Sequence, residues 1–239
     1  MDDKILVSIA SYKDSDVINT IIDLYDKAER PDRVYVGLFL QDTDQEILRI
    51  LDFFSNFLFK KNLKIKTIPF KDAKGCGWAR NVILRELYGH EDYFMCVDSH
   101  SRFLKKWDLI YIDTYKKAPE NAVISAFPQS FDFVETYEQY TRRNLATIYT
   151  PNALPWTNDF NHPHCQKTPT EKYEKVMSIS GGNIFGDSRL AKAITLDDYS
   201  FVHNKEQEIY SLLIYLYGLD IYAIPQNVVW HKYTVEESY

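Results

Sequence analysis

The chain has 239 residues, of which 45% are hydrophobic and 26% charged, and this composition excludes a disordered chain, a fibrous repeat and a coiled coil. Its formal net charge of −6 argues against a general nucleic-acid coat and against a binder of anionic membranes, because both are usually basic. There is no signal peptide, no apolar run of the roughly 18 residues that a spanning helix needs, and no disulfide framework among Cys76, Cys96 and Cys165. We therefore expect free thiols and a cytoplasmic protein with no membrane or nucleic-acid partner.

Short apolar runs alternate with segments of helical periodicity through the first half of the chain. Strands are expected at 5–10, 33–40, 63–68 and 93–97, and helices from Val17 to about Pro31, at 44–59 and at 78–87. Alternating elements of this length are typical of a parallel sheet with short connections. The sequence therefore predicts an α/β fold with a central, mostly parallel sheet flanked by helices.

The second half of the chain is less regular. Residues 149–175 hold four of the nine prolines and two of the six histidines, which predicts a long loop of the kind that forms lids and binding loops. A helix at 204–217 is expected to end at Gly218, followed by a strand-like stretch at 220–231. We expect one domain over 1–239, with a nucleotide-binding half at about 1–103 and an acceptor- and sugar-shaping half at about 104–239.

The strongest chemical signal is an apolar strand that ends in an acid, Tyr93-Phe-Met-Cys-Val-Asp98-Ser-His100. The side chains of residues i and i+2 in an extended chain lie on the same side. Asp98 and His100 could therefore bind one cation at the carboxyl edge of the sheet. The alternative is a strand-end turn with a solvated Asp and His. His231 follows another apolar run and offers a third ligand, although a lone histidine there is usually packed or exposed. One carboxylate and two imidazoles suit Mn²⁺ or another transition ion better than Mg²⁺.

Two glycine-containing segments are candidates for contact with a nucleotide sugar. Lys74-Gly-Cys-Gly-Trp78-Ala-Arg80-Asn81 opens a helix and offers backbone N–H groups and basic side chains to a phosphate or sugar. Ser180-Gly181-Gly182-Asn183 lets a ligand approach the backbone closely. The alternatives are an ordinary helix start and a plain tight turn.

Two acids stand in the first turn of the expected 204–217 helix. Glu206 and Glu208 can be stabilised there by the helix dipole without any function. The functional alternative is that one of them, Glu206 before Glu208, is a catalytic carboxylate that faces the reacting sugar.

Several of these strings resemble the GlcNAc-transferase family of cytoplasmic glycosyltransferases, which is typified by enzymes that modify hydroxyproline on a target protein. The strings are Val7-Ser-Ile-Ala-Ser-Tyr-Lys-Asp14, Trp78-Ala-Arg80-Asn81, Val97-Asp-Ser-His100-Ser-Arg102-Phe103 and Trp107-Asp108, and the match runs from about residue 4 to 231. The resemblance implies a GT-A fold, a UDP-sugar donor and a divalent metal. The pattern is also similar to the polypeptide GalNAc-transferases, which use Asp-x-His and a late His on Mn²⁺.

The resemblance also implies roles for individual residues. Asp98, His100 and His231 match the metal ligands; Ser8, Ala10 and Tyr12 match the first-strand edge that holds the nucleoside; Arg80 matches the basic residue near the nucleotide sugar; and Gly181 and Gly182 match the backbone beside the donor sugar. Trp78 and Asn81 belong to the same donor-binding string. The family's Gly-Glu-Glu element is altered here to Lys205-Glu-Gln-Glu208, and a following arginine is missing.

Together these expectations describe a metal-dependent glycosyltransferase that moves GlcNAc or a related hexose from a UDP-sugar to a hydroxyl on a protein or glycan. The resemblance favours retention of the anomeric configuration. Two other classes remain open. A nucleotidyltransferase shares the α/β sheet and a metal, but it normally has a basic Gly-rich loop where this chain has Ser11-Tyr12. A non-catalytic nucleotide-sugar-binding module is disfavoured by the intact Asp98, His100 and His231.

Overall fold

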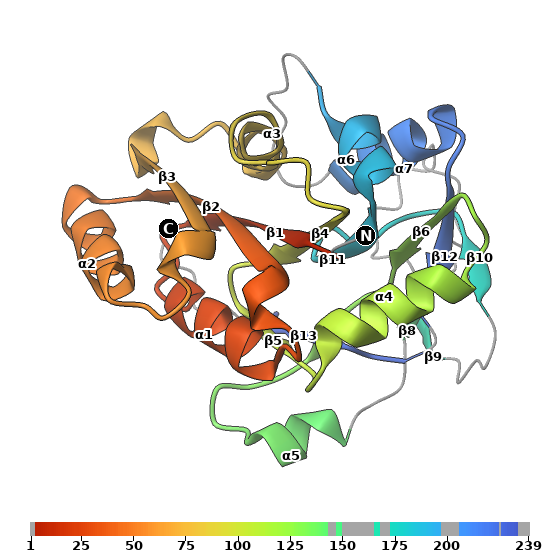
Figure 1. Cartoon of the computed structure of the whole chain (residues 1–239), viewed down its shortest axis with the longest axis horizontal. Helices are drawn as coiled ribbons and strands as arrows, with labels where there is room; N and C mark the ends of the chain where they lie inside the picture. Colours follow the sequence, from red (N-terminus) through yellow and green to blue (C-terminus); the bar gives the residue numbers. More distant parts are fainter. Residues whose placement is uncertain are drawn as a thin grey trace.

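A twisted central sheet runs through the molecule (Figure 1), a computed structural model that describes residues 3–142, 173–196, 206–224 and 226–233, and the backbone of 147–149 and 165–167. Within this part of the chain the sheet has eight strands in the order β10-β12-β6-β11-β4-β1-β2-β3. They are β1 (Ile5–Tyr12), β2 (Val34–Asp42), β3 (Leu63–Pro69), β4 (Tyr93–Asp98), β6 (Ala122–Ser125), β10 (Glu174–Val176), β11 (Asn183–Asp187) and β12 (Asp220–Ala223).

The four N-terminal strands form a continuous parallel block. β1 pairs in parallel with both β2 and β4, and β2 pairs in parallel with β3. Ile5, Val7 and Ile9 of β1 enter one hydrophobic cluster while Leu6 enters the other, so this strand is buried on both faces. β11 runs antiparallel between β4 and β6, and β10 is antiparallel at the sheet edge.

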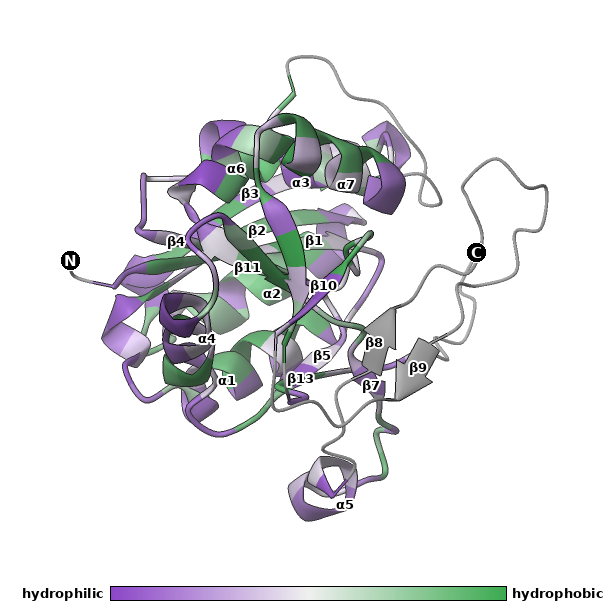
Figure 2. Ribbon diagram, turned by 90° about the vertical axis from the view of Figure 1, so that its right-hand side faces the viewer, coloured by the Kyte–Doolittle hydropathy of each residue, from purple (hydrophilic) through white to green (hydrophobic). Residues whose placement is uncertain are grey.

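Helices cover both faces of the sheet (Figures 1 and 2). On one face lie α1 (Val17–Lys27), α2 (Asp44–Ser55) and α4 (Trp107–Lys117); on the other lie α3 (Cys76–Glu86), α6 (Ser188–Ile194) and α7 (Glu206–Leu216). Three short segments form 3-10 helices: η1 (Pro31–Arg33), η2 (Lys60–Asn62) and η3 (Phe70–Asp72). The buried residues of α1 recur at helical spacing, which turns its apolar stripe to the sheet.

A smaller sheet lies beside the carboxyl end of β4. It has the order β5-β13-β7, formed by β5 (Ser101–Phe103), β13 (Val229–His231) and β7 (Gln129–Ser130). The helix α5 (Tyr137–Thr141) packs against it through Tyr140, whose ring lies 5.1 Å from that of Trp230. A two-stranded pair, β8 (Thr147–Tyr149) and β9 (Cys165–Lys167), completes the described elements.

The predicted α/β class is confirmed, and each strand and helix expected in the first half is present. The second half departs from the prediction, because the expected strand at 220–231 is two strands, β12 and β13, in different sheets. Most of the expected 149–175 loop, residues 204–205 and the side chain of Cys165 lie outside the described residues. Cys76 and Cys96 are free thiols, and no described helix is long and apolar enough to cross a membrane.

Candidate functional site

Asp98, His100 and His231 converge at the carboxyl edge of the central sheet. The Nε2 atoms of His100 and His231 lie 2.9 Å apart, and His231 Nε2 lies 3.1 Å from Asp98 Oδ2. All three ligand atoms fall within 4.8 Å of one another, although 131 residues separate the two histidines. Asp98 ends β4, and His231 is brought beside it because β13 pairs with β5.

A turn, rather than an extended chain, brings Asp98 and His100 to the same point. β4 ends at Asp98 and β5 begins at Ser101, whose hydroxyl donates to the Asp98 carbonyl at 2.8 Å. The His100 carbonyl accepts from Lys232 N at 3.2 Å, which fastens the turn to the strand that carries His231. The i, i+2 reasoning from an extended strand is therefore wrong in its geometry, while the convergence that it predicted is present.

The donor set fits a divalent transition ion. Two imidazole nitrogens that face each other at 2.9 Å need either a shared proton or a shared ion between them. Separations of 2.9 and 3.1 Å are also those of neighbouring ligands on one ion with bonds of about 2.1 Å. An oxygen and two nitrogens agree with the expected preference for Mn²⁺-like ions over Mg²⁺.

Asp14 contacts this cluster and is not among the residues that we predicted for it. Its Oδ2 lies 2.7 Å from His100 Nδ1 and accepts the Ser99 hydroxyl at 2.6 Å. Burial raises the pKa of Asp14, but the hydrogen bonds from His100 and Ser99 outweigh it and hold that pKa below its usual range. Conversely, burial lowers the pKa of His100, and the Asp14 contact more than offsets this, so the net shift is upward. The sequence shows that Asp14 follows the first strand, but only the structure shows that this strand lies beside β4.

Arg80 forms ion pairs with two carboxylates, one of which is Asp98 of the cluster. Its Nη2 donates to Asp98 Oδ1 at 2.6 Å and its Nη1 donates to Glu206 Oε1 at 2.5 Å, and its side chain is 3% exposed. Burial raises the pKa of Asp98, but the His231 hydrogen bond and the Arg80 charge override it and place that pKa well below its usual range. Arg80 therefore holds Asp98 in the charged form with Oδ2 turned toward the histidines.

Gly181 and Gly182 lie against these same side chains. A Cβ on Gly182 would stand 2.4 Å from Asp98 Oδ2, and one on Gly181 would stand 3.1 Å from Arg80 Nη1. A side chain at Gly182 would meet Asp98, and one at Gly181 would meet Arg80 and Gln207, so the two glycines leave room for the Arg80–Asp98 ion pair.

The two acids of α7 have different environments. Glu206 is buried and points to Arg80, whereas Glu208 is exposed. Residues two apart on a helix project on different sides, so only Glu206 belongs to the cluster. Its contact is with Arg80, which distinguishes it from a solvated acid at a helix end.

The residues expected to bind the nucleotide-sugar donor differ in their exposure to solvent. Tyr12 ends β1 and is 48% exposed, Ala10 and Trp78 are half-buried, and Ser8 is fully buried within the strand. Asn81 is buried and bonds the backbone of Leu196, with Leu196 N donating to its Oδ1 at 3.0 Å. Tyr12 therefore offers the open aromatic surface at this edge, while Ser8 and Asn81 face the interior.

Comparison with profiles of known protein families shows the family to which the chain belongs. A profile of the family described as "Glycosyltransferase (GlcNAc)" matches residues 4–50 and 51–238. The chain belongs to this GlcNAc glycosyltransferase family. This match confirms the resemblance that we drew from the sequence strings, which runs from about residue 4 to 231. A search of curated proteins gave no match.

Solved glycosyltransferases share the fold of this family member. S. aureus TarS 1–349 in complex with UDP-GlcNAc aligns with a TM-score of 0.61 and 16% identity, over 98% of this chain and 60% of that one. GalNAc-T7 with UDP, GalNAc and Mn²⁺ aligns with a TM-score of 0.70 and 13% identity, over 98% of this chain and 44% of that one. The expected GT-A fold is confirmed, and the chain spans less than two thirds of the length of either structure.

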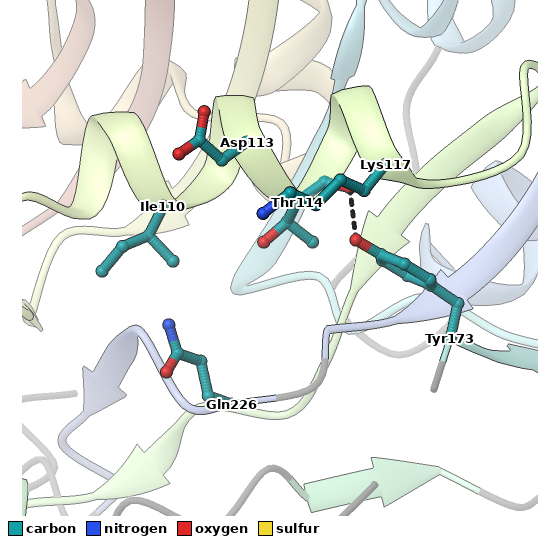
Figure 3. Close-up of a pocket in the computed structure, with 6 residues that line it drawn as sticks. All are labelled: Ile110, Asp113, Thr114, Lys117, Tyr173 and Gln226. Carbon is teal, nitrogen blue, oxygen red and sulfur yellow. Dashed lines mark hydrogen bonds between the residues drawn. The ribbon is translucent and has the colours of Figure 1, made fainter. Parts of the chain in front are cut away.

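A separate hollow of about 420 Å³ lies between α4 and the segment before β13 (Figure 3). It is lined by Ile110, Asp113, Thr114, Lys117, Tyr173 and Gln226, and the Tyr173 hydroxyl donates to the Thr114 carbonyl at 2.8 Å. None of the residues predicted for the site lines it, so this hollow and the ion-pair cluster are distinct features of the family member.

Proposed function

We propose that this family member is a metal-dependent glycosyltransferase that moves a sugar from a UDP-sugar to a hydroxyl group. The observation that carries the proposal is the convergence of Asp98, His100 and His231 at the carboxyl edge of β4. That edge is where open α/β sheets bind nucleotides. Family membership supports GlcNAc or a related hexose as the sugar, and the solved relatives bound to UDP-GlcNAc or to UDP and Mn²⁺ support the donor class.

We assign a different role to each of the residues at this edge. Asp98, His100 and His231 would hold a divalent ion, which when bound neutralises the negative charge that the leaving UDP gains. Tyr12, half exposed at the end of β1, gives the nucleoside a surface to stack on. Arg80 keeps the Asp98 carboxylate charged and aimed at the ion position. Glu206 lies on the other side of Arg80 and is the carboxylate that we place nearest the donor sugar.

For the acceptor, we propose only the chemical class of the group that receives the sugar. We propose a hydroxyl on a protein or a glycan, with retention of the anomeric configuration, following the resemblance of the sequence strings to protein-modifying transferases. Gly181 and Gly182 would line the sugar with backbone while they leave room for Arg80 and Asp98.

The test is calorimetric titration with UDP, with Mn²⁺ and with EDTA, followed by a screen of UDP- and GDP-sugars for metal-dependent hydrolysis. We expect UDP to bind at least tenfold more tightly with Mn²⁺ and UDP-GlcNAc or a related UDP-hexose to be hydrolysed. Asp98→Asn should abolish both effects, because it removes a ligand that also pairs with Arg80. Asp113→Asn, an exposed acid on α4, is the matched control and should behave as the wild type.

Other results would reject the proposal. UDP binding that is equal in Mn²⁺ and EDTA would favour a binding module without metal-dependent catalysis. Release of pyrophosphate from a nucleoside triphosphate and a sugar phosphate would identify a nucleotidyltransferase.

A further inference from the structure

Asp14 contacts the cluster from outside the three candidate ligands. Its side chain is 14% exposed, and it meets His100 at Nδ1, the ring nitrogen opposite the one that faces His231. Because His100 Nε2 lies toward the common point and Nδ1 lies toward Asp14, the two nitrogens have separate partners. A carboxylate in this place accepts a hydrogen bond from Nδ1–H and leaves the Nε2 lone pair free.

We propose that Asp14 is a positioning residue that holds His100 in the Nδ1–H tautomer and fixes its ring, so that Nε2 is presented to the metal. The proposal rests on the proposed function, in which His100 is a metal ligand. It adds a third chain segment, the loop after β1, to the two that carry the candidate ligands, the β4–β5 turn and β13.

Asp14 is itself held by contacts on both oxygens. Oδ1 accepts Asp16 N at 2.9 Å, and Oδ2 accepts the Ser99 hydroxyl at 2.6 Å in addition to its contact with His100. Lys13, just before it, has a left-handed φ of 47°, and this sharp turn ends β1. The carboxylate therefore cannot swing away from His100 without breaking two further bonds.

A second tier of contacts joins the same two loops. Thr20 of α1 donates from Oγ1 to the Ser99 carbonyl at 2.7 Å and accepts from Ser101 N at 3.0 Å. Arg102 makes two bonds of 2.9 Å to Asp16. The loop after β1 and the helix α1 that follows it are thus bonded to the turn after β4 and to β5, which gives the rigidity that a positioning residue needs.

Default imidazole chemistry opposes the required tautomer. A neutral histidine with no directing partner favours the proton on Nε2, and in His100 that proton would point at His231 and at the ion position. Asp14 reverses the preference by accepting a hydrogen bond from Nδ1–H. Removing its charge should therefore weaken metal binding even though no ligand is lost.

The first test measures Mn²⁺ affinity through the EPR signal of free Mn²⁺, which needs no substrate. Asp14→Asn should weaken binding by about 10- to 100-fold. Asp113→Asn, which makes the same change at an exposed acid of α4, is the control; we expect a change of less than about threefold. Thermal unfolding of each metal-free variant reports whether the fold is kept.

The second test needs no metal. Long-range ¹H–¹⁵N spectra at alkaline pH, with the His100 signals assigned by comparison with His100→Gln, should show the Nδ1–H form in the wild type and the Nε2–H form in Asp14→Asn. An Nε2–H wild type overturns the proposal, whether or not the variants fold.

The outcomes separate the two proposals. If the wild type binds Mn²⁺ and Asp14→Asn binds it equally well, only the positioning role is overturned. If the wild type binds no Mn²⁺, the proposed function fails, and the metal role of Asp14 fails with it even where the tautomer is as expected.

Discussion

Gly182 shows how one missing methyl group shapes the cluster. Its backbone passes so close to the Asp98 carboxylate that a Cβ would stand 2.4 Å from Oδ2, the oxygen that faces His231. Contacts this short do not persist, so either the backbone or the carboxylate must move. The position therefore requires glycine for the sake of a neighbouring side chain.

We predict that Gly182→Ala weakens Mn²⁺ binding at least tenfold, because it displaces a ligand oxygen. Free Mn²⁺ measured by EPR checks this. Gly186→Ala is the matched control, since its Cβ would meet the Leu190 side chain at 3.1 Å, away from the metal ligands. Equal affinities in the two variants would contradict the expected displacement.

At this scale the sequence predicted the convergence of the three candidate ligands and missed the contacts that hold them in place. Asp98, His100 and His231 are recognisable because few residue types bind metals and each follows an apolar run. The Arg80 partners are 18 and 126 residues away, and the Asp14–His100 contact spans 86 residues. Such pairs depend on which strands are neighbours, and residue spacing does not reveal strand order.

Among the elements, α7 is attached to the rest of the molecule by a buried ion pair. Glu206 stands at its first turn and reaches Arg80 of α3, which in turn reaches Asp98 at the end of β4. Stabilisation by the helix dipole alone would contribute about 0.3–1 kcal/mol. Loss of Glu206 from the buried pair costs more, because Arg80 Nη1 loses its acceptor and the guanidinium keeps only its contact with Asp98.

Glu206→Ala should accordingly lower the free energy of unfolding by about 3 kcal/mol. Glu208→Ala removes an exposed acid from the same turn and should change it by less than about 0.5 kcal/mol. Urea unfolding of the two variants provides the measurement. Similar midpoints would mean that the Arg80 pair contributes little to holding α7.

The elements also show where prediction from sequence succeeds. Strands β1, β2 and β4 are recognisable because parallel strands buried on both faces appear as continuous apolar runs. β3 lies half-buried at the edge of the sheet and is recognisable by its alternation of apolar residues with Lys64 and Lys66. β6 and β12 have four residues each, and β11 is antiparallel between β4 and β6. Runs this short carry no clear period, so the middle of the sheet and the break between β12 and β13 become visible only in the structure.

For the whole molecule, the candidate ligands belong to two sheets. Asp98 ends a strand of the central sheet, and His231 ends a strand of the small sheet. An ion bound by both would link them and stabilise the folded state by mass action. At a concentration of 100 times Kd this amounts to about 2.7 kcal/mol, or about 5–10 °C in Tm for a chain of this size.

We predict that this increase in Tm depends on pH. The pKa of His100 lies above its usual 6.5, and a metal binds only the unprotonated ring. The proton therefore competes as the pH falls through the raised pKa, so the Mn²⁺-induced shift should be present at pH 8 and lost by about pH 5.5. Differential scanning calorimetry with Mn²⁺ and with EDTA checks this, with Asp98→Asn as the control. A shift of equal size at both pH values would be inconsistent with histidine ligands.

The distance along the chain between the candidate ligands has a consequence for synthesis on the ribosome. Strands β1 to β4 are complete once residue 98 has emerged, so this block can pair early. β1–β2 and β2–β3 join consecutive strands, whereas β1–β4 joins strands whose paired residues Ile5 and Tyr93 are 88 positions apart (93 − 5). β13 supplies its histidine only at residue 231. A nascent chain released before that point would carry the parallel block β1–β4 and two of the three candidate ligands. We expect such a product to remain compact without being able to form the metal centre.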